Sequence, residues 1–188
     1  MLELKEGMLL YHGSYTEVSK IDLSKCIAGK DFGKGFYTTS SIEQAKNFIH
    51  LTVNRAINRK IIPSDTDFGY ISTFRCKNIN LLKIKKFDEA NREWLHYIAA
   101  NREPELFQAL IIEYEKFNAI IGKIANDRTA ATLQLYLSGA YGEPGSENAD
   151  AMAISTLLPN KLENQVCFKD ETAISTLEFV KSEKYGIR

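Results

Sequence analysis

The fold of this chain is decided by two stretches, Tyr11-His12-Gly13-Ser14 and Gly33-Lys34-Gly35-Phe36-Tyr37-Thr38-Thr39. The first ends an apolar run, Met8-Leu9-Leu10-Tyr11, that is typical of a short buried strand. We therefore expect His12 and Gly13 to emerge at the end of a strand, where ligand clefts commonly open. The two glycines of the second stretch permit a tight turn and a close approach of the backbone to a ligand. The aromatic and β-branched residues after them favour another strand.

Composition is typical of an ordinary globular protein. The 188 residues predict a single domain, 1–188, and an apolar content of 44% is enough to bury a core without disulfides or metals. The 24 basic and 24 acidic residues cancel, so no overall field selects nucleic acid or an anionic membrane as a partner.

The cysteines and the N-terminus predict a cytoplasmic protein without a metal. Cys26, Cys76 and Cys167 are odd in number and far apart, which favours free, buried thiols over a disulfide framework or a zinc site. His50 and His96 have no metal-ligand spacing with them, and we expect both on the surface or on a helix face. The first residues lack the pattern of a signal peptide, and no run of about eighteen apolar residues occurs.

Periodicity and turn residues predict helices alternating with short strands. The expected helices are residues 42–59 after a Ser40/Glu43 capping box, 88–115 with a break near Pro104, a helix from Asp127 that Gly139 ends, and 147–158 before Pro159. The expected strands are 70–76, 119–122, 165–168 and 177–180, with 78–84 pairing with the first of these or continuing it.

Residues 11–48 resemble the catalytic domain of the diphtheria-toxin-like ADP-ribosyltransferases, which include the poly(ADP-ribose) polymerases. That family carries His-Gly-Ser after a strand, Gly-Lys-Gly-aromatic-Tyr after a loop, and a Glu inside a later Asn-Glu-aromatic-aliphatic strand. The third motif is altered here to Asn164-Gln165-Val166-Cys167-Phe168. The Asp-Phe-Gly-Lys-Gly-Phe-Tyr of residues 31–37 is also similar to a set of uncharacterised bacterial proteins of the same superfamily, in which Gln often takes the third position.

The resemblance implies an α+β fold in which two small packed β-sheets and flanking helices surround an NAD cleft. Tyr37 would stack on the cationic nicotinamide ring, and a desolvated cation–π contact contributes on the order of 2 kcal/mol. Phe48 would close the other face of the ring, although its position also suits core packing of a helix. The implied catalytic residues are Gln165, His12 and Tyr37, and the implied NAD-binding residues are His12, Gly13, Ser14, Gly35, Tyr37, Phe48 and Arg128.

Two departures from the family bear on activity. Ala45 stands where the polymerases have a Ser that binds the carboxamide, and Gln165 stands in place of the Glu. Gln can accept a hydrogen bond from a ribose hydroxyl, but it carries no charge and cannot act as a base. Mono-transfer is therefore expected rather than polymer formation, with the acceptor or another acid replacing the lost anion. Alternatively, Gln165 is a solvent-facing strand residue.

Asn126-Asp127-Arg128 is the stretch where we expect a replacement acid. Arg128 at a helix start could meet a pyrophosphate, and Asp127 is either the acid or a helix cap. The basic residues of 83–86 are either a nucleic-acid patch or a solvated edge strand.

The sequence supports three hypotheses about function. The first is an NAD-dependent mono-ADP-ribosyltransferase whose acceptor is a protein, a nucleic acid or a small molecule; the resemblance extends to bacterial toxins paired with an antitoxin protein and to delivered effectors. The second is an NAD-binding module that lacks transferase activity because of Gln165. The third, a cysteine hydrolase using Cys167 and His12, has only its residue types in its favour.

Overall fold

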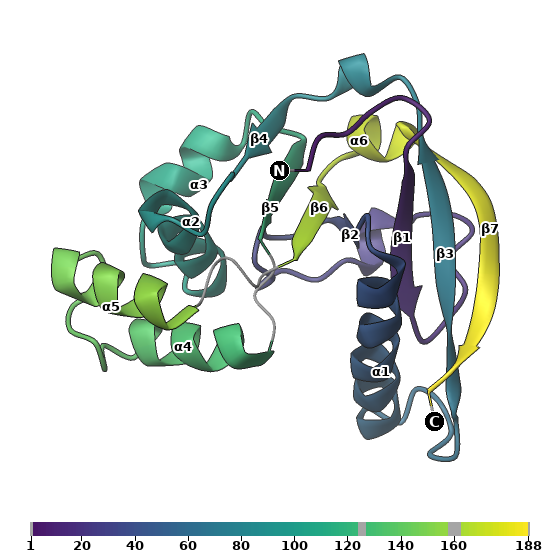
Figure 1. Ribbon diagram of the computed structural model, residues 1–188, viewed down its shortest axis with the longest axis horizontal. Coiled ribbons are helices and arrows are strands. Elements are labelled where there is room, and N and C mark those ends of the chain that lie inside the picture. Colours follow the sequence, from purple (N-terminus) through teal and green to yellow (C-terminus); the bar gives the residue numbers. More distant parts are fainter. Residues whose placement is uncertain (1, 124–126, 158–162, 188) are drawn as a thin grey trace.

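The computed structural model describes residues 2–123, 127–157 and 163–187, which form two small β-sheets and flanking helices (Figure 1). One sheet has the order β1-β3-β7 and the other β2-β6-β5-β4. The strands are β1 (Leu9–Ser14), β2 (Phe36–Thr38), β3 (Phe68–Cys76), β4 (Ile84–Lys86), β5 (Ala119–Lys123), β6 (Asn164–Phe168) and β7 (Leu177–Gly186). The helices are α1 (Ile42–Asn58), α2 (Arg92–Arg102), α3 (Gln108–Tyr114), α4 (Asp127–Leu137), α5 (Glu147–Leu157) and α6 (Glu171–Ser175). The expectation of an α+β chain with two small sheets is confirmed.

The two sheets meet where β1 runs beside the end of β2. Tyr11 and Thr39 exchange backbone hydrogen bonds of 2.8 and 2.9 Å there, and we call this junction the seam. Leu10 and Phe74 of the first sheet pack in one core with residues of the second sheet, among them Phe168. Shared burial of apolar side chains therefore holds the sheets together alongside the backbone bridge.

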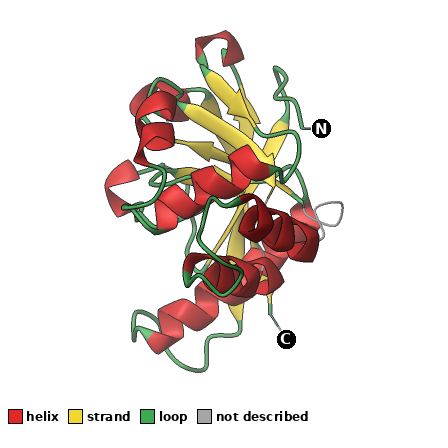
Figure 2. Ribbon diagram, turned by 90° about the vertical axis from the view of Figure 1, so that its left-hand side faces the viewer, coloured by secondary structure: helices red, strands yellow, loops and turns green. Residues whose placement is uncertain are grey.

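Helices cover the two sheets from different sides. α1 lies along the first sheet against β1 (Figure 1), where Ala45, Ile49 and Val53 pack on Ile71 of β3. α2 to α5 lie on the side of the second sheet and stand in front of the strands in Figure 2. Trp94 of α2 is fully buried in the apolar core between these helices and the second sheet. Its indole N–H donates to the Lys123 carbonyl at 3.2 Å. In the described part of the chain, no helix is both long enough and apolar enough to span a membrane.

Several predicted boundaries need correction. Ser41, not Ser40, caps α1, because its side chain accepts the hydrogen bond from the Gln44 N–H. α2 starts later than expected, at Arg92, because the side chain of Asn91 caps it. The break near Pro104 is confirmed, since α2 ends at Arg102 and α3 starts at Gln108. β1 runs on to Ser14, so the His12 and Gly13 positions lie inside the strand and not at its end.

Residues 78–84 also differ from the expectation. They neither pair with β3 nor continue it, because a short 3₁₀ turn at Ile79–Leu81 leads the chain across to β4. β4 lies parallel to β5 at the edge of the second sheet, so the edge-strand interpretation of residues 83–86 is confirmed. Lys85 is committed to an ion pair with Glu93 at 2.6 Å.

Candidate functional site

The seam brings His12 of β1 against the backbone of Tyr37 in β2. The imidazole Nδ1 lies 2.7 Å from the Tyr37 carbonyl oxygen, and the ring packs on Phe36 with centroids 4.5 Å apart. A carbonyl only accepts hydrogen bonds, so Nδ1 carries the proton and Nε2 keeps its lone pair. Burial lowers the pKa of His12, and the bond to the Tyr37 carbonyl offsets this only in part. At neutral pH the imidazole is therefore a neutral acceptor at Nε2.

Gly13 presents its backbone toward the seam. The Met8 carbonyl accepts from Cys76 of β3, whereas the backbone of Tyr11 bonds to Thr39 across the seam. Because backbone groups alternate in direction along a strand, the N–H and C=O of Gly13 point the same way as those of Tyr11. A Cβ at Gly13 would lie 2.0 Å from the Ala45 carbonyl oxygen, so α1 packs directly on this backbone.

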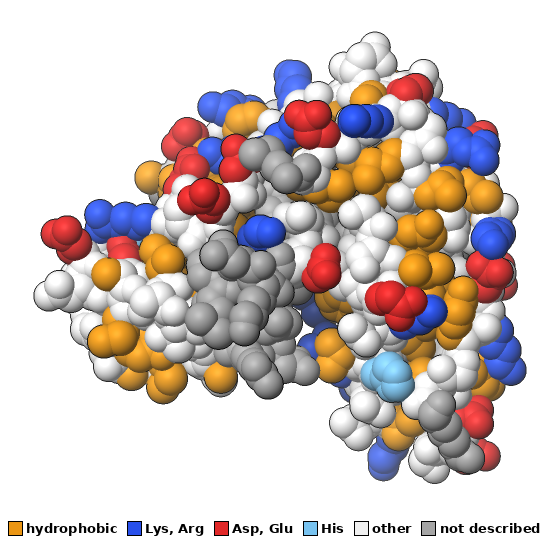
Figure 3. All heavy atoms as spheres, viewed as in Figure 1, with side chains coloured by type: hydrophobic (Ala, Val, Ile, Leu, Met, Phe, Trp, Pro, Cys, Tyr) orange, Lys and Arg blue, Asp and Glu red, His pale blue; other side chains and the backbone are white. Residues whose placement is uncertain are grey.

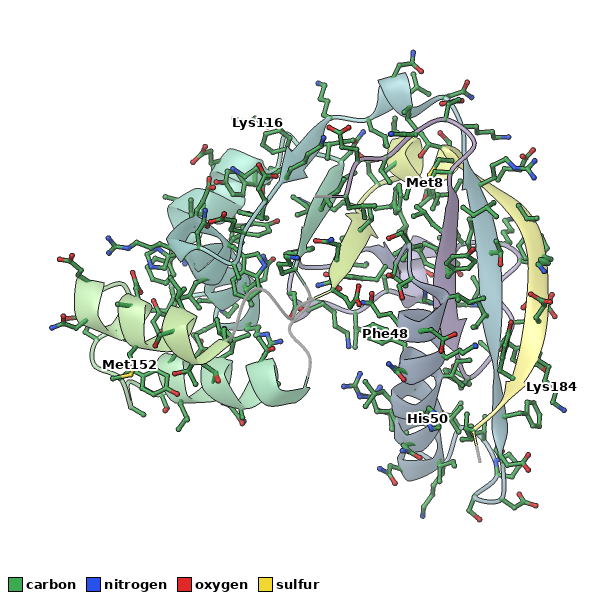
Figure 4. All side chains as sticks on the ribbon, in the orientation of Figure 1. Met8, Phe48, His50, Lys116, Met152 and Lys184 are labelled. Carbon is green, nitrogen blue, oxygen red and sulfur yellow. The ribbon has the colours of Figure 1, made fainter. Side chains whose placement is uncertain are left out.

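Phe48 of α1 lies beside Gly13 of β1. Its Cβ would be 3.3 Å from a Cβ at Gly13, and its side chain is half-buried rather than enclosed in the core. Figure 4 shows Phe48 toward the upper end of α1. Phe48 is not among the residues that pack in the three apolar cores of the described chain, and its role as a wall of the nicotinamide site stays a prediction.

The glycine turn holds the Tyr37 ring through its hydroxyl. This hydroxyl donates to the Gly33 carbonyl at 2.7 Å and accepts from the Phe32 N–H at 3.0 Å. Gly33 has a φ of +80°, which favours glycine, and a Cβ at Gly35 would lie 2.5 Å from Cys167 Sγ. Burial, more than any neighbouring group, raises the pKa of Tyr37. The ring is thus a neutral, half-buried platform fixed at both ends.

Gln165 is buried on the same face of the second sheet as Tyr37. Tyr37 pairs with Cys167, and side chains alternate along a strand, so Gln165 shares the face of those two residues. Only 5% of Gln165 is exposed, so the solvent-facing interpretation is wrong. Its Nε2 donates to Asp31 Oδ2 at 3.0 Å, while Asp31 Oδ1 accepts from Arg102 Nη2 at 2.6 Å.

Asp31 and Arg102 are site residues that sequence reasoning missed. Asp31 belongs to the quoted Asp-Phe-Gly stretch, but an acid ahead of a glycine turn is expected to be exposed, and here only 8% of it is. Arg102 ends α2, 71 residues from Asp31, and no local pattern predicts their contact.

Cations from three parts of the chain gather around the loop that carries Asp31. Burial lowers the pKa of the half-buried Lys30, and the neighbouring charges of Arg55 and Arg59 lower it further. Arg102 lies close enough to contribute as well. This concentration of positive charge beside the glycine turn suits a phosphate-bearing ligand.

Three further sequence expectations concern the stretch 126–128, Ser14 and Cys167. Asn126 and the side chains of Asp127 and Arg128 lie outside the described residues, so their roles stay predictions. Ser14 is buried, and its hydroxyl accepts from the Thr16 N–H at 3.4 Å within its own turn. Cys167 is fully buried, and burial raises its pKa to about 12, which opposes the nucleophilic role of the hydrolase hypothesis.

Figure 3 shows the molecular surface hollowed between the part that carries α4 and α5 and the part that carries α1. Two further hollows lie elsewhere, and neither is lined by His12, Tyr37 or Gln165. One of them is lined by Asn91, Arg92, Glu93, His96 and Leu110.

His50 is exposed on α1, as expected (Figure 4), and His96 lies on α2 within a largely buried polar cluster. Its Nε2 lies 2.8 Å from Asp150 Oδ2, and its ring stacks on Phe107 with centroids 4.0 Å apart. Asp150 also accepts from the Tyr136 hydroxyl and pairs with Arg92, both at 2.5 Å. The cluster ties α2, α4 and α5 together.

We expect Asp150→Asn to lower the free energy of unfolding by about 2 kcal/mol, because hydrogen bonds to a buried charge are lost. Burial alone would raise the pKa of Asp150, but the bonds from Tyr136 and His96 outweigh it and leave the pKa lowered. This stability is therefore present above the ordinary aspartate pKa and is lost as the pH falls through the lower, folded-state value. Urea unfolding at several acidic pH values measures it, with exposed Glu171→Gln as the control. Equal stability of both variants would contradict the structural role.

These observations define an α+β protein whose candidate site lies at a seam between two sheets. The model of a family described as proteins of unknown function (DUF3990) matches residues 8–179, and the chain belongs to that family. The matched span includes β1, β2 and β6, the three strands of the site. No curated protein matches the chain.

Proposed function

We propose that the chain is an NAD-dependent mono-ADP-ribosyltransferase. One observation carries the proposal: His12 of β1 lies against the Tyr37 backbone at the seam, and Gln165 of β6 is buried on the same sheet face as the Tyr37 ring. Nε2 of a neutral His12 suits a ribose hydroxyl, and the fixed Tyr37 ring suits a cationic nicotinamide. The seam-facing backbone of Gly13 offers a paired donor and acceptor for the carboxamide.

The reaction balances without a further reactant besides the acceptor. The bond between the nicotinamide nitrogen and ribose C1′ breaks, and its electron pair neutralises the ring nitrogen. Positive charge develops on the ribose. A lone pair of the acceptor's nucleophile then bonds to C1′, and the acceptor's proton leaves to solvent or a base. The acceptor class, whether protein, nucleic acid or small molecule, is part of the proposal that the experiment below resolves.

An NAD-binding module without turnover is the second candidate. The uncharged Gln165 favours it, because Gln cannot itself stabilise the developing cation as a carboxylate does. Both candidates predict NAD binding at the seam, and only the transferase predicts release of nicotinamide.

The test incubates the purified chain with NAD labelled in the adenylate part, with and without cell lysate. The transferase predicts free nicotinamide and label on an acceptor, both reduced in His12→Ala. NAD binding without release selects the binding module. Neither binding nor release overturns both candidates.

Affinity for NAD is expected to weaken as the pH falls below the ordinary histidine value of about 6.5. Protonation of Nε2 converts the acceptor on His12 into a donor, and the lowered pKa of His12 shifts this change toward more acidic pH. The unfolded chain takes up this proton first, so stability also falls in the same range. Calorimetric titration from about pH 5 to 8 measures the affinity. His12→Gln keeps an acceptor that does not titrate and should flatten the profile; an unchanged profile would contradict the role of His12.

A further inference from the structure

We propose that Asp31 is a positioning residue that turns the Gln165 amide toward the ribose and places negative charge behind it. The inference rests on the proposed function. The Asp31 carboxylate takes the place of the Asp127 acid expected from the sequence, and it reaches the site from the loop ahead of the glycine turn.

The orientation of the amide follows from hydrogen-bond chemistry. A carboxylate only accepts, so the group of Gln165 that lies 3.0 Å from Asp31 Oδ2 is its Nε2. Because Asp31 takes the amide nitrogen, the amide oxygen lies on the other side of the group, where it can accept a hydrogen bond. A ribose hydroxyl is the kind of donor that would fill this position. Without Asp31, nothing in this contact would select between the two orientations of the amide.

Arg102 and Gln165 bind opposite oxygens of the Asp31 carboxylate. Arg102 binds Oδ1, the oxygen that does not face Gln165, and thus anchors the carboxylate from behind. Asp31 is 8% exposed and Gln165 5%, so little water separates or screens them. Donation to a carboxylate polarises the amide and makes its oxygen a better acceptor for a hydroxyl next to a developing cation.

The arrangement makes a specific prediction for Gln165→Glu. A new carboxylate at this position would face Asp31 across a hydrogen-bond distance, and two such groups cannot both ionise. Gln165→Glu alone should therefore gain little activity and lose stability. Combined with Asp31→Asn, the same change restores one carboxylate and one amide in reversed order, with the carboxylate now nearer the ribose.

The experiment measures kcat and KM for nicotinamide release from NAD by the full chain and its variants. We expect Asp31→Asn to lower kcat about 10- to 100-fold with KM changed less than about threefold. The double variant Asp31→Asn/Gln165→Glu should regain at least the wild-type kcat, while Gln165→Glu alone should not exceed it. Glu17→Gln, an exposed acid on the same connection between β1 and β2, is the matched control and should behave as wild type. Circular dichroism and thermal unfolding confirm that each variant is folded.

The outcomes separate this inference from the proposed function. No release by the wild-type chain overturns both. Release by the wild type together with an unchanged kcat in Asp31→Asn overturns only the role of Asp31. If Asp31→Asn lowers kcat and the double variant does not recover it, Asp31 has a structural role and the inference is overturned. A carboxylate at position 165 would then fail to replace the one lost at position 31.

Discussion

Gly13→Ala is expected to prevent stable folding, with a loss of more than about 4 kcal/mol in the free energy of unfolding. The added Cβ would lie 2.0 Å from the Ala45 carbonyl oxygen and 2.9 Å from its carbonyl carbon. Both are backbone atoms inside α1, so no side-chain rotation relieves the clash, and α1 would have to separate from β1. Urea unfolding followed by circular dichroism measures the change.

Gly186→Ala is the matched control for this prediction. Gly186 also lies in a strand, and a Cβ there would meet nothing within 4 Å. It should change stability by less than about 1 kcal/mol. If Gly13→Ala unfolds at the same urea concentration as Gly186→Ala, the close packing of α1 on β1 is contradicted.

Tyr37→Ala is expected to weaken NAD binding by about 100-fold. Losing a desolvated cation–π contact of about 2 kcal/mol accounts for roughly 30-fold, and loosening of the glycine turn adds to it, because the hydroxyl no longer ties Gly33 and Phe32. Calorimetric titration with NAD measures the affinity, and the same titration with ADP-ribose separates the nicotinamide contribution from the rest of the ligand.

Tyr37→Phe divides the two effects. It keeps the ring and leaves the Gly33 carbonyl and the Phe32 N–H without the hydroxyl, so stability should fall by about 1 to 3 kcal/mol while NAD affinity changes less than about fivefold. If Tyr37→Ala loses no more affinity for NAD than for ADP-ribose, the ring does not stack on nicotinamide.

The fold could be predicted from the sequence wherever local chemistry is decisive. The glycines of residues 33–35, the Pro104 break and the apolar run of β5 each placed an element correctly. The prediction was wrong where a neighbour in space decides. The 3₁₀ turn at Ile79–Leu81 carries the chain to the second sheet because β4 pairs with β5, and no residue within 78–84 encodes that partner.

The candidate site shows the same division. Its motif residues are readable because they sit within two short stretches and one strand. The Asp31–Gln165 hydrogen bond joins residues 134 apart and needs the Asp31 loop folded against β6, so no local sequence pattern predicts it. Burial reverses the expected role of such an acid, from a solvated turn residue to a fixed charge.

The seam between Tyr11 and Thr39 has a mechanical consequence. His12 belongs to one sheet, whereas Tyr37 and Gln165 belong to the other. A ligand bound to all three residues would connect the two sheets directly. Pulling the sheets apart would then require releasing the ligand first, so occupancy of the site and the mechanical resistance of the fold would rise and fall together.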